Sequence, residues 1–226
     1  MSKLDSLIES KSPRELALRE QFATPGQQRE TATTGMWIFL ITEVLLFGAL
    51  FTAFTVYLVS APQAFDMGSH EMEILLGAIN TAVLICSSFT MALAVYYSEV
   101  GNQKLIVLFL LLTMLIGAIF LGIKFTEYYD HFRDHKVPGL WFEQGGPLAP
   151  HIEMFFVFYF IMTGLHALHM LIGISILSVL AFRTLIGHID AEYHTPIELG
   201  GLYWHFIDIV WVFLYAIFYI PGLHVR

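Results

Sequence analysis

Five long apolar runs that contain no Lys or Arg constrain this chain more than any other feature. Each is long enough, or nearly so, to cross a hydrocarbon core about 30 Å thick, which takes ~20 helical residues. Composition agrees, because 57% of the 226 residues are hydrophobic and only 13% are charged, whereas a soluble domain has about 25% charged residues. We therefore predict an all-α integral membrane protein, a bundle of five transmembrane helices. The predicted spans are Met36–Val59, Ile74–Tyr97, Leu105–Ile123, Met154–Phe182 and Leu202–Ile220.

The remaining segments divide into an N-terminal arm and one membrane domain. We predict that residues 1–35 form a cytoplasmic arm, with a short capped helix at Ser12–Glu20 and a break in the helix over 23–35. Residues 36–226 form the transmembrane domain. Its one large segment outside the bilayer is the outer loop 124–153, which continues the third span before Pro and Gly residues force an irregular path.

The distribution of Lys and Arg predicts the orientation. Seven of the eleven Lys and Arg residues lie on the side of the membrane that holds the N-terminus. Cytoplasmic segments carry the excess of these residues, so we expect the N-terminus in the cytoplasm and the C-terminus outside, in the periplasm of a bacterial cell. The net charge of −8 argues against nucleic acid as a partner.

Glu43 and Asp208 are the only acidic residues within the five predicted spans. Glu43 lies about two turns inside the bilayer among apolar residues. Burial disfavours a charged carboxylate. Glu43 is then either a protonated packing carboxyl that bonds to a neighbouring helix, or a proton-responsive group of the kind that intramembrane carboxyls often are. The residues alone leave both readings open.

Three histidines accompany Asp208 within the membrane. His205 shares a helix face with Asp208, and His166 shares one with His169. We expect these histidines to donate or accept hydrogen bonds between helices, one of them to Asp208 or a backbone carbonyl. The alternative is a haem with His166 or His169 and His205 as axial ligands, because these positions lie at similar depths on different helices.

His131 and His135 stand four residues apart, a spacing that can place two nitrogens on one metal. Acidic and basic residues interleave with them, as in a solvated helix end, and we assign no metal ligand. Arg183 ends the fourth span at the cytoplasmic face. It could hold a lipid headgroup or serve as a plain interfacial anchor.

Four stretches of the sequence form a recognisable set, namely WIFLITEVLLF, AINTAVLICSS, MTGLHALHMLIG and YWHFIDIVWVFLY. On these stretches the chain resembles subunit III of the haem–copper oxidases over about residues 31–226. The pair Glu127 and Tyr128 resembles the Glu-Tyr pair at the outer end of the corresponding family helix.

The resemblance implies a non-catalytic subunit with no cofactor of its own, because haem and copper belong to partner subunits in this family. It implies packing beside catalytic subunit I, together with subunit II and small subunits, and membership of a respiratory supercomplex remains open. It also implies bound phospholipid and a role in sustaining proton uptake and stability during oxygen reduction, in the bacterial inner membrane. We expect a cytochrome c oxidase. The alternatives are a quinol oxidase, an accessory protein of nitric oxide reductase, or a haem-bearing cytochrome b-type anchor.

Site residues are carried over from the family by position. Glu43 matches the carboxyl that dicyclohexylcarbodiimide modifies, and Arg183 resembles an arginine near lipid headgroups. A structural polar network is expected from the remaining matched residues, which are His166, His169, His205, Asp208 and Glu127.

The chain also departs from the family pattern. The first two helices of the seven-helix form are absent, as in five-helix versions. Lys124 stands where glutamine is common, Ala167 replaces a glycine, and PLAPHIEMFF replaces the usual entry to the fourth span.

Overall fold

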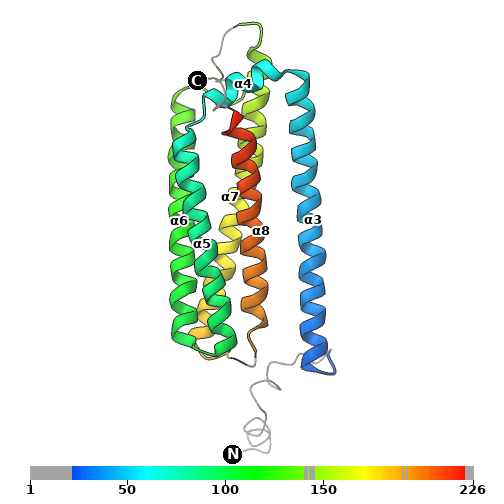
Figure 1. Cartoon of the computed structure of the whole chain (residues 1–226), viewed down its shortest axis with the longest axis vertical. Coiled ribbons are helices and arrows are strands. Elements are labelled where there is room, and N and C mark those ends of the chain that lie inside the picture. The colour runs from blue at the N-terminus through cyan, green and yellow to red at the C-terminus, as the bar shows by residue number, and fades with distance from the viewer. Residues whose placement is uncertain (1–21, 140–141, 143–145, 190, 192, 222–226) are drawn as a thin grey trace, which may run out of the picture.

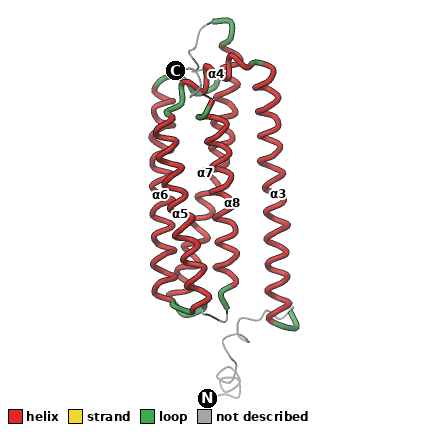
Figure 2. Tube along the Cα trace, in the orientation of Figure 1, coloured by secondary structure: helices red, strands yellow, loops and turns green. Residues whose placement is uncertain are grey.

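The computed structural model describes residues 22–139, 142, 146–189, 191 and 193–221, and within them every regular element is a helix (Figure 2). The capped helix expected at Ser12–Glu20 lies outside the described residues. Five of the helices are long and apolar enough to cross a membrane, which confirms the predicted fold class. The spanning helices are α3 (Pro25–Ser60), α5 (Ile74–Val100), α6 (Gln103–Arg133), α7 (Ala149–Leu185) and α8 (Thr195–Phe218), and α4 (Pro62–His70) is the short one.

Helices α5 to α8 form a four-helix bundle, and α3 stands beside it (Figure 1). Around the bundle, α5 packs against α6 and α8, and α7 packs against the same two helices. Helix α3 contacts the bundle less extensively, through α7 and α8. The start of α3 and the end of α8 lie at opposite ends of the bundle, as an odd number of crossings requires.

Helix α3 begins well before the bilayer. The expected break over 23–35 is wrong, because Thr24 caps a helix that starts at Pro25 and continues into the first span. The Thr24 hydroxyl accepts a hydrogen bond from Gln27 N at 3.2 Å, and proline is suited to the first helical position. Arg29 then fastens this extension to α8 with two bonds to Glu198, of 2.9 and 3.2 Å.

Trp204 packs closely inside the bundle, and its indole is fully buried between α6 and α7. Its Nε1 donates to the Ser87 hydroxyl at 2.9 Å. A Cβ atom added at Gly117 would stand 2.8 Å from the ring, and one at Gly173 would stand 3.1 Å away. These two glycines therefore make the space that the indole fills.

Helix α4 lies across the end of the bundle at which α8 finishes, and it packs against α7 (Figure 1). Its sequence, PQAFDMGSH, is short and only partly apolar, so it predicts no spanning helix. Phe65 anchors it with edge-to-face contacts to Phe54 of α3 and Phe155 of α7, at centroid distances of 5.2 and 5.7 Å. Gly68 allows the approach, since a Cβ there would lie 2.5 Å from the Phe155 ring. The helix therefore closes the aromatic core at this end.

The outer loop begins as expected, with α6 continuing past the apolar span to Arg133. His135 then takes a left-handed backbone conformation, with φ of 54°. Beyond it, Lys136 forms an ion pair with Glu71 at 2.7 Å, which ties the loop to the end of α4.

Candidate functional site

Glu43 and His169 form an ion pair or hydrogen bond between α3 and α7. The distance from Glu43 Oε2 to His169 Nε2 is 3.0 Å, and both side chains are at least 86% shielded from solvent. The Phe47 ring covers the imidazole at a centroid distance of 5.5 Å. Glu43 therefore has the partner on a neighbouring helix that its interpretation as a packing carboxyl predicts. This partner is His169.

The contact of the second ring nitrogen of His169 limits how the pair can be protonated. His169 Nδ1 is 2.8 Å from the Leu165 carbonyl oxygen, which can only accept, so Nδ1 carries a hydrogen. Nε2 then either accepts from a protonated Glu43 or, as an imidazolium, donates to the carboxylate. Both arrangements place one shared proton between the two side chains. The pair is thus a hydrogen-bonded link between α3 and α7.

His205 and Asp208 do not bond to each other. His205 Nδ1 is 2.7 Å from the Ser88 hydroxyl on α5, and the two side chains form a hydrogen bond across the bundle surface. Asp208 is 7% exposed, and neither carboxyl oxygen has a hydrogen-bond partner among the described residues. We expected a histidine to bond to Asp208 or to a backbone carbonyl, and the structure shows the second, because His169 Nδ1 bonds to the Leu165 carbonyl oxygen.

His166 is the most enclosed of the three membrane histidines, at 1% exposure. Its ring lies edge-on to Phe120 and tilted against Trp211, with centroid distances of 5.5 and 5.2 Å. Neither ring nitrogen has a hydrogen-bond partner within the described part of the chain. The structure thus separates the expected polar network into pairs and single residues on different faces.

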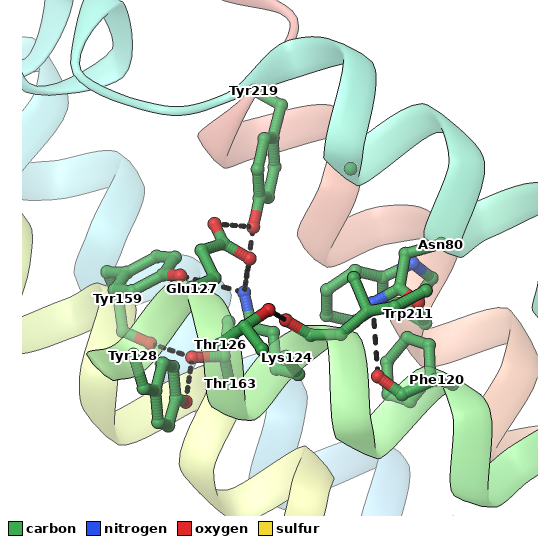
Figure 3. Close-up of polar contacts among 12 residues, drawn as sticks. Asn80, Phe120, Lys124, Thr126, Glu127, Tyr128, Tyr159, Thr163, Trp211 and Tyr219 are labelled. Carbon is green, nitrogen blue, oxygen red and sulfur yellow. Dashed lines mark hydrogen bonds and ion pairs between the residues drawn. The ribbon is translucent and has the colours of Figure 1, made fainter. Parts of the chain in front are cut away.

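A larger polar cluster surrounds Lys124 in the C-terminal half of α6 (Figure 3). The Lys124 ammonium donates to Glu127 Oε2 at 3.0 Å, to the Tyr159 hydroxyl at 2.8 Å and to the Tyr219 hydroxyl at 2.7 Å. An ammonium has three donors, and all three are used here. The Tyr219 hydroxyl in turn donates to the other Glu127 oxygen at 2.6 Å.

Aromatic rings enclose this Lys124 cluster, which comprises Lys124, Glu127, Tyr159 and Tyr219. The ammonium lies 4.5 Å from the centroid of the Tyr159 ring and 5.1 Å from that of Trp211. Lys124 and Glu127 are both about 97% buried. A buried cation needs both a counter-charge and satisfied donors, and this cluster supplies both. The lysine that departs from the family pattern is therefore neutralised by the matched Glu127.

The remaining predicted site residues lie apart from these clusters. Arg183 is half-buried in the last turn of α7. His131 is buried against Tyr159 and Phe156, whereas His135 is exposed beyond the end of α6, so the two do not share a helix face. Among the described residues, no group of three His, Cys, Asp or Glu side chains is placed to hold a metal ion.

Sequence reasoning missed two polar partners that the structure reveals. Lys124 was noted only as a departure, although its spacing of three from Glu127 indicates an ion pair on one helix face. The second is Ser88 of α5. Nothing local in the sequence indicates that its hydroxyl meets His205, 117 residues further along the chain.

Comparison with known proteins agrees with the resemblance. A family model described as "Cytochrome c oxidase subunit III" matches residues 150–223. The chain is 31% identical over 190 residues to a protein named "Probable quinol oxidase subunit 3" from Staphylococcus aureus (strain USA300), which covers 84% of this chain and 88% of that one. A protein of the same name from Staphylococcus haemolyticus (strain JCSC1435) is 30% identical over 190 residues.

Identity of this size extends over 84% of the chain. The five spanning helices are those of a multi-pass membrane protein. The chain therefore belongs to the subunit III family of the haem–copper oxidases, and it is a non-catalytic subunit of a respiratory oxidase that associates with the other subunits of its complex.

Proposed function

We propose that this chain is subunit III of a terminal oxidase that takes its electrons from a quinol. The observation that carries this proposal is the name shared by its Staphylococcus relatives, "Probable quinol oxidase subunit 3". The sequence alone favoured a cytochrome c oxidase, and the description of the matching family model keeps that as the second candidate. In either case the residues that receive electrons belong to other subunits, as does the haem and copper chemistry.

The electron donor is tested on the purified complex. Oxygen consumption is measured with a reduced quinol analogue and, on the same preparation, with reduced cytochrome c. We expect turnover with the quinol only. Turnover with cytochrome c only would assign the second candidate, and reduction of nitric oxide without oxygen consumption would assign the accessory role in nitric oxide reductase.

Within the complex, the proposed role of this chain is to sustain proton uptake and stability during turnover. The pair formed by Glu43 and His169 supports this role, because it places a carboxyl and an imidazole in hydrogen-bond contact and joins the loosely attached α3 to α7. A proton on Glu43 also makes it a target for carbodiimides, which react with carboxylic acids. Phospholipid bound beside α7, with its headgroup at Arg183, belongs to the same proposal.

Carbodiimide labelling tests the proton on Glu43. Dicyclohexylcarbodiimide should modify Glu43 in the intact complex, and Glu43→Gln should abolish the modification. The Gln variant is a matched change, since its amide can still bond to His169 Nε2. Modification of Asp208 in place of Glu43 would overturn the assignment.

The proposal includes no haem in this chain. His169 uses one ring nitrogen for the Leu165 carbonyl and the other for Glu43, and His205 uses Nδ1 for Ser88. An axial ligand needs a free ring nitrogen aimed at the iron. The contacts of His169 therefore argue against it as an axial ligand, because neither of its ring nitrogens is free. The single bond at His205 Nδ1 and the unpartnered nitrogens of His166 carry no such argument, so for these two histidines the proposal rests on the family resemblance.

The proposed orientation keeps the N-terminus in the cytoplasm and the C-terminus in the periplasm. Lys124 is one of the four Lys and Arg residues that do not lie on the N-terminal side of the membrane. In the structure it is buried and paired with Glu127. A buried, neutralised lysine adds nothing to the charge of a loop, so the excess of basic residues on the N-terminal side is larger than the sequence count suggested.

A further inference from the structure

Asp208 borders a groove on the outer surface of the bundle, between α5 and α8. The groove has a volume of about 320 Å³, and its wall includes Ser88 and His205 as well as Asp208. Its rim is apolar and faces outward, since Ile209 is 57% exposed and Ile85 is 59% exposed. Asp208 lies about 20 Å along α8 from its cytoplasmic end, near the middle of the membrane.

A buried carboxyl without a partner is costly in a membrane, where water does not supply the missing bonds. Other polar side chains on the surface of this chain avoid the cost locally. Thr52 donates to the Gly48 carbonyl and Ser175 donates to the Leu171 carbonyl, both at 2.8 Å within their own helices. Asp208 has no such bond among the described residues. The Ser88 hydroxyl lies beside Asp208 in the same groove, but its bond in the structure is to His205. The α5–α8 groove is therefore a surface where Asp208 can take a donor from outside the chain.

The length of the surface indicates what could supply that donor. A second groove of about 480 Å³ shares His205 with the first and continues to Glu198 and Arg29 at the cytoplasmic end. The two together follow α8 from Glu198 to Val212, which is about 21 Å at 1.5 Å per residue. This is the length over which a membrane-crossing helix makes contact. A lipid chain could fill the same length, but it would leave the Asp208 carboxyl without a donor.

We propose that a transmembrane helix of a neighbouring oxidase subunit docks in the α5–α8 groove and places an N–H or O–H donor side chain against Asp208. The proposal rests on the oxidase assignment made above, which supplies the partner. The exposed face of α6 differs from the groove because it is aliphatic. Its side chains Leu108, Leu111 and Leu115 are each more than half exposed. That face suits lipid.

Site-specific photocrosslinking in the assembled complex tests the docking surface. Benzoylphenylalanine is placed at Ile209 on the groove rim or, as the control, at Leu115 on α6. The two positions are similarly exposed, at 57% and 59%, and lie at similar depth. We expect Ile209 to crosslink to another oxidase subunit and Leu115 to crosslink to lipid. Lipid products alone at Ile209, a crosslink to a second copy of this chain, or equal subunit crosslinking at Leu115 would overturn the proposal.

The donor to Asp208 is tested by the rate at which this chain is lost from the detergent-solubilised complex. An interhelical hydrogen bond in a membrane contributes about 1–2 kcal/mol, so Asp208→Leu should speed the loss about 5- to 30-fold. Thr52→Val is the control and should leave the rate unchanged, because the Thr52 hydroxyl bonds to its own helix. An unchanged rate in Asp208→Leu contradicts the donor. The photocrosslinking experiment does not use the Asp208 variant, so it remains valid even if that variant fails to fold. Neither experiment depends on the electron donor, so the docking proposal and the quinol proposal can fail separately.

Discussion

Breaking the Lys124 cluster on one side should cost far more than removing both charges. Lys124→Met leaves Glu127, which is 3% exposed, without its counter-ion and leaves two tyrosine hydroxyls without a donor. Removing one partner of a buried pair typically costs about 3–5 kcal/mol, because the other charge stays buried. Glu127→Gln should cost a similar amount by leaving the ammonium unpaired.

The double variant Lys124→Met/Glu127→Gln buries no charge. Its remaining cost is the lost bonds to Tyr159 and Tyr219, at about 1 kcal/mol each. Methionine also fills much of the volume that the lysine stem occupies. We therefore expect a net loss of about 1–2 kcal/mol, against a sum of roughly 6–10 kcal/mol for the two single variants. The coupling energy between the two positions should be at least about 3 kcal/mol.

The assay is unfolding of the purified chain by sodium dodecyl sulfate in mixed micelles, followed by tryptophan fluorescence. Trp211 is a local reporter, since its ring centroid lies 5.1 Å from the Lys124 nitrogen. The matched control is Arg133→Met/Asp130→Asn, an exposed pair on the same helix with atoms 3.9 Å apart, which should change stability by less than about 1 kcal/mol. Additive single effects, or single effects as small as those of the control, would refute the view that these two charges stabilise each other.

Four further outcomes follow from the structure. Gly117→Ala should cost about 1–3 kcal/mol because its Cβ would meet Trp204, whereas Gly122→Ala, with nothing within 4 Å, should be neutral in the same unfolding assay. Arg183→Ala should reduce the phospholipid retained in native mass spectra of the complex, and His188→Ala on the same surface should not; equal retention would leave Arg183 a plain anchor. In a Cys86→Ser background, an impermeant thiol reagent should label a cysteine at the exposed Met67 but not one at the exposed His188 of intact cells, and the reverse pattern would invert the topology. The purified chain should show no Soret band, and one haem per chain would instead favour the cytochrome b-type reading.

The fold could be predicted because the membrane imposes a single requirement. Every backbone polar group in hydrocarbon must be bonded within the chain, so a run of ~20 apolar residues becomes a helix whatever its neighbours. The ends of the helices carry no such requirement. Pro25 and Gly26 were read as a break, but Thr24 makes them the start of α3. Helix α4 was missed because Phe65 is stabilised by Phe54 and Phe155, which are distant in sequence.

The candidate site could be predicted residue by residue but not pair by pair. Glu43, His169 and Asp208 were singled out because polar residues in a membrane need partners. Which partner each one meets depends on how the helices rotate about their axes, and helices with nearly uniform apolar surfaces leave that rotation undetermined. Glu43 thus meets His169, 126 residues away, while Asp208 faces a surface groove. Only the pair of Lys124 and Glu127, within one helix, could be inferred from spacing alone.

The non-catalytic role is tested most directly by removing this chain from the oxidase complex. Oxygen consumption is followed over many turnovers at neutral pH, and the haem and copper contents are measured on the same samples. We expect full metal content and an initial rate close to that of the intact complex, followed by a faster loss of activity, with Glu43→Ala showing a milder form of the same loss. A depleted complex that keeps its metals but has no initial activity would show that the chain is catalytic, and one that turns over as long as the intact complex would show that it does not protect turnover.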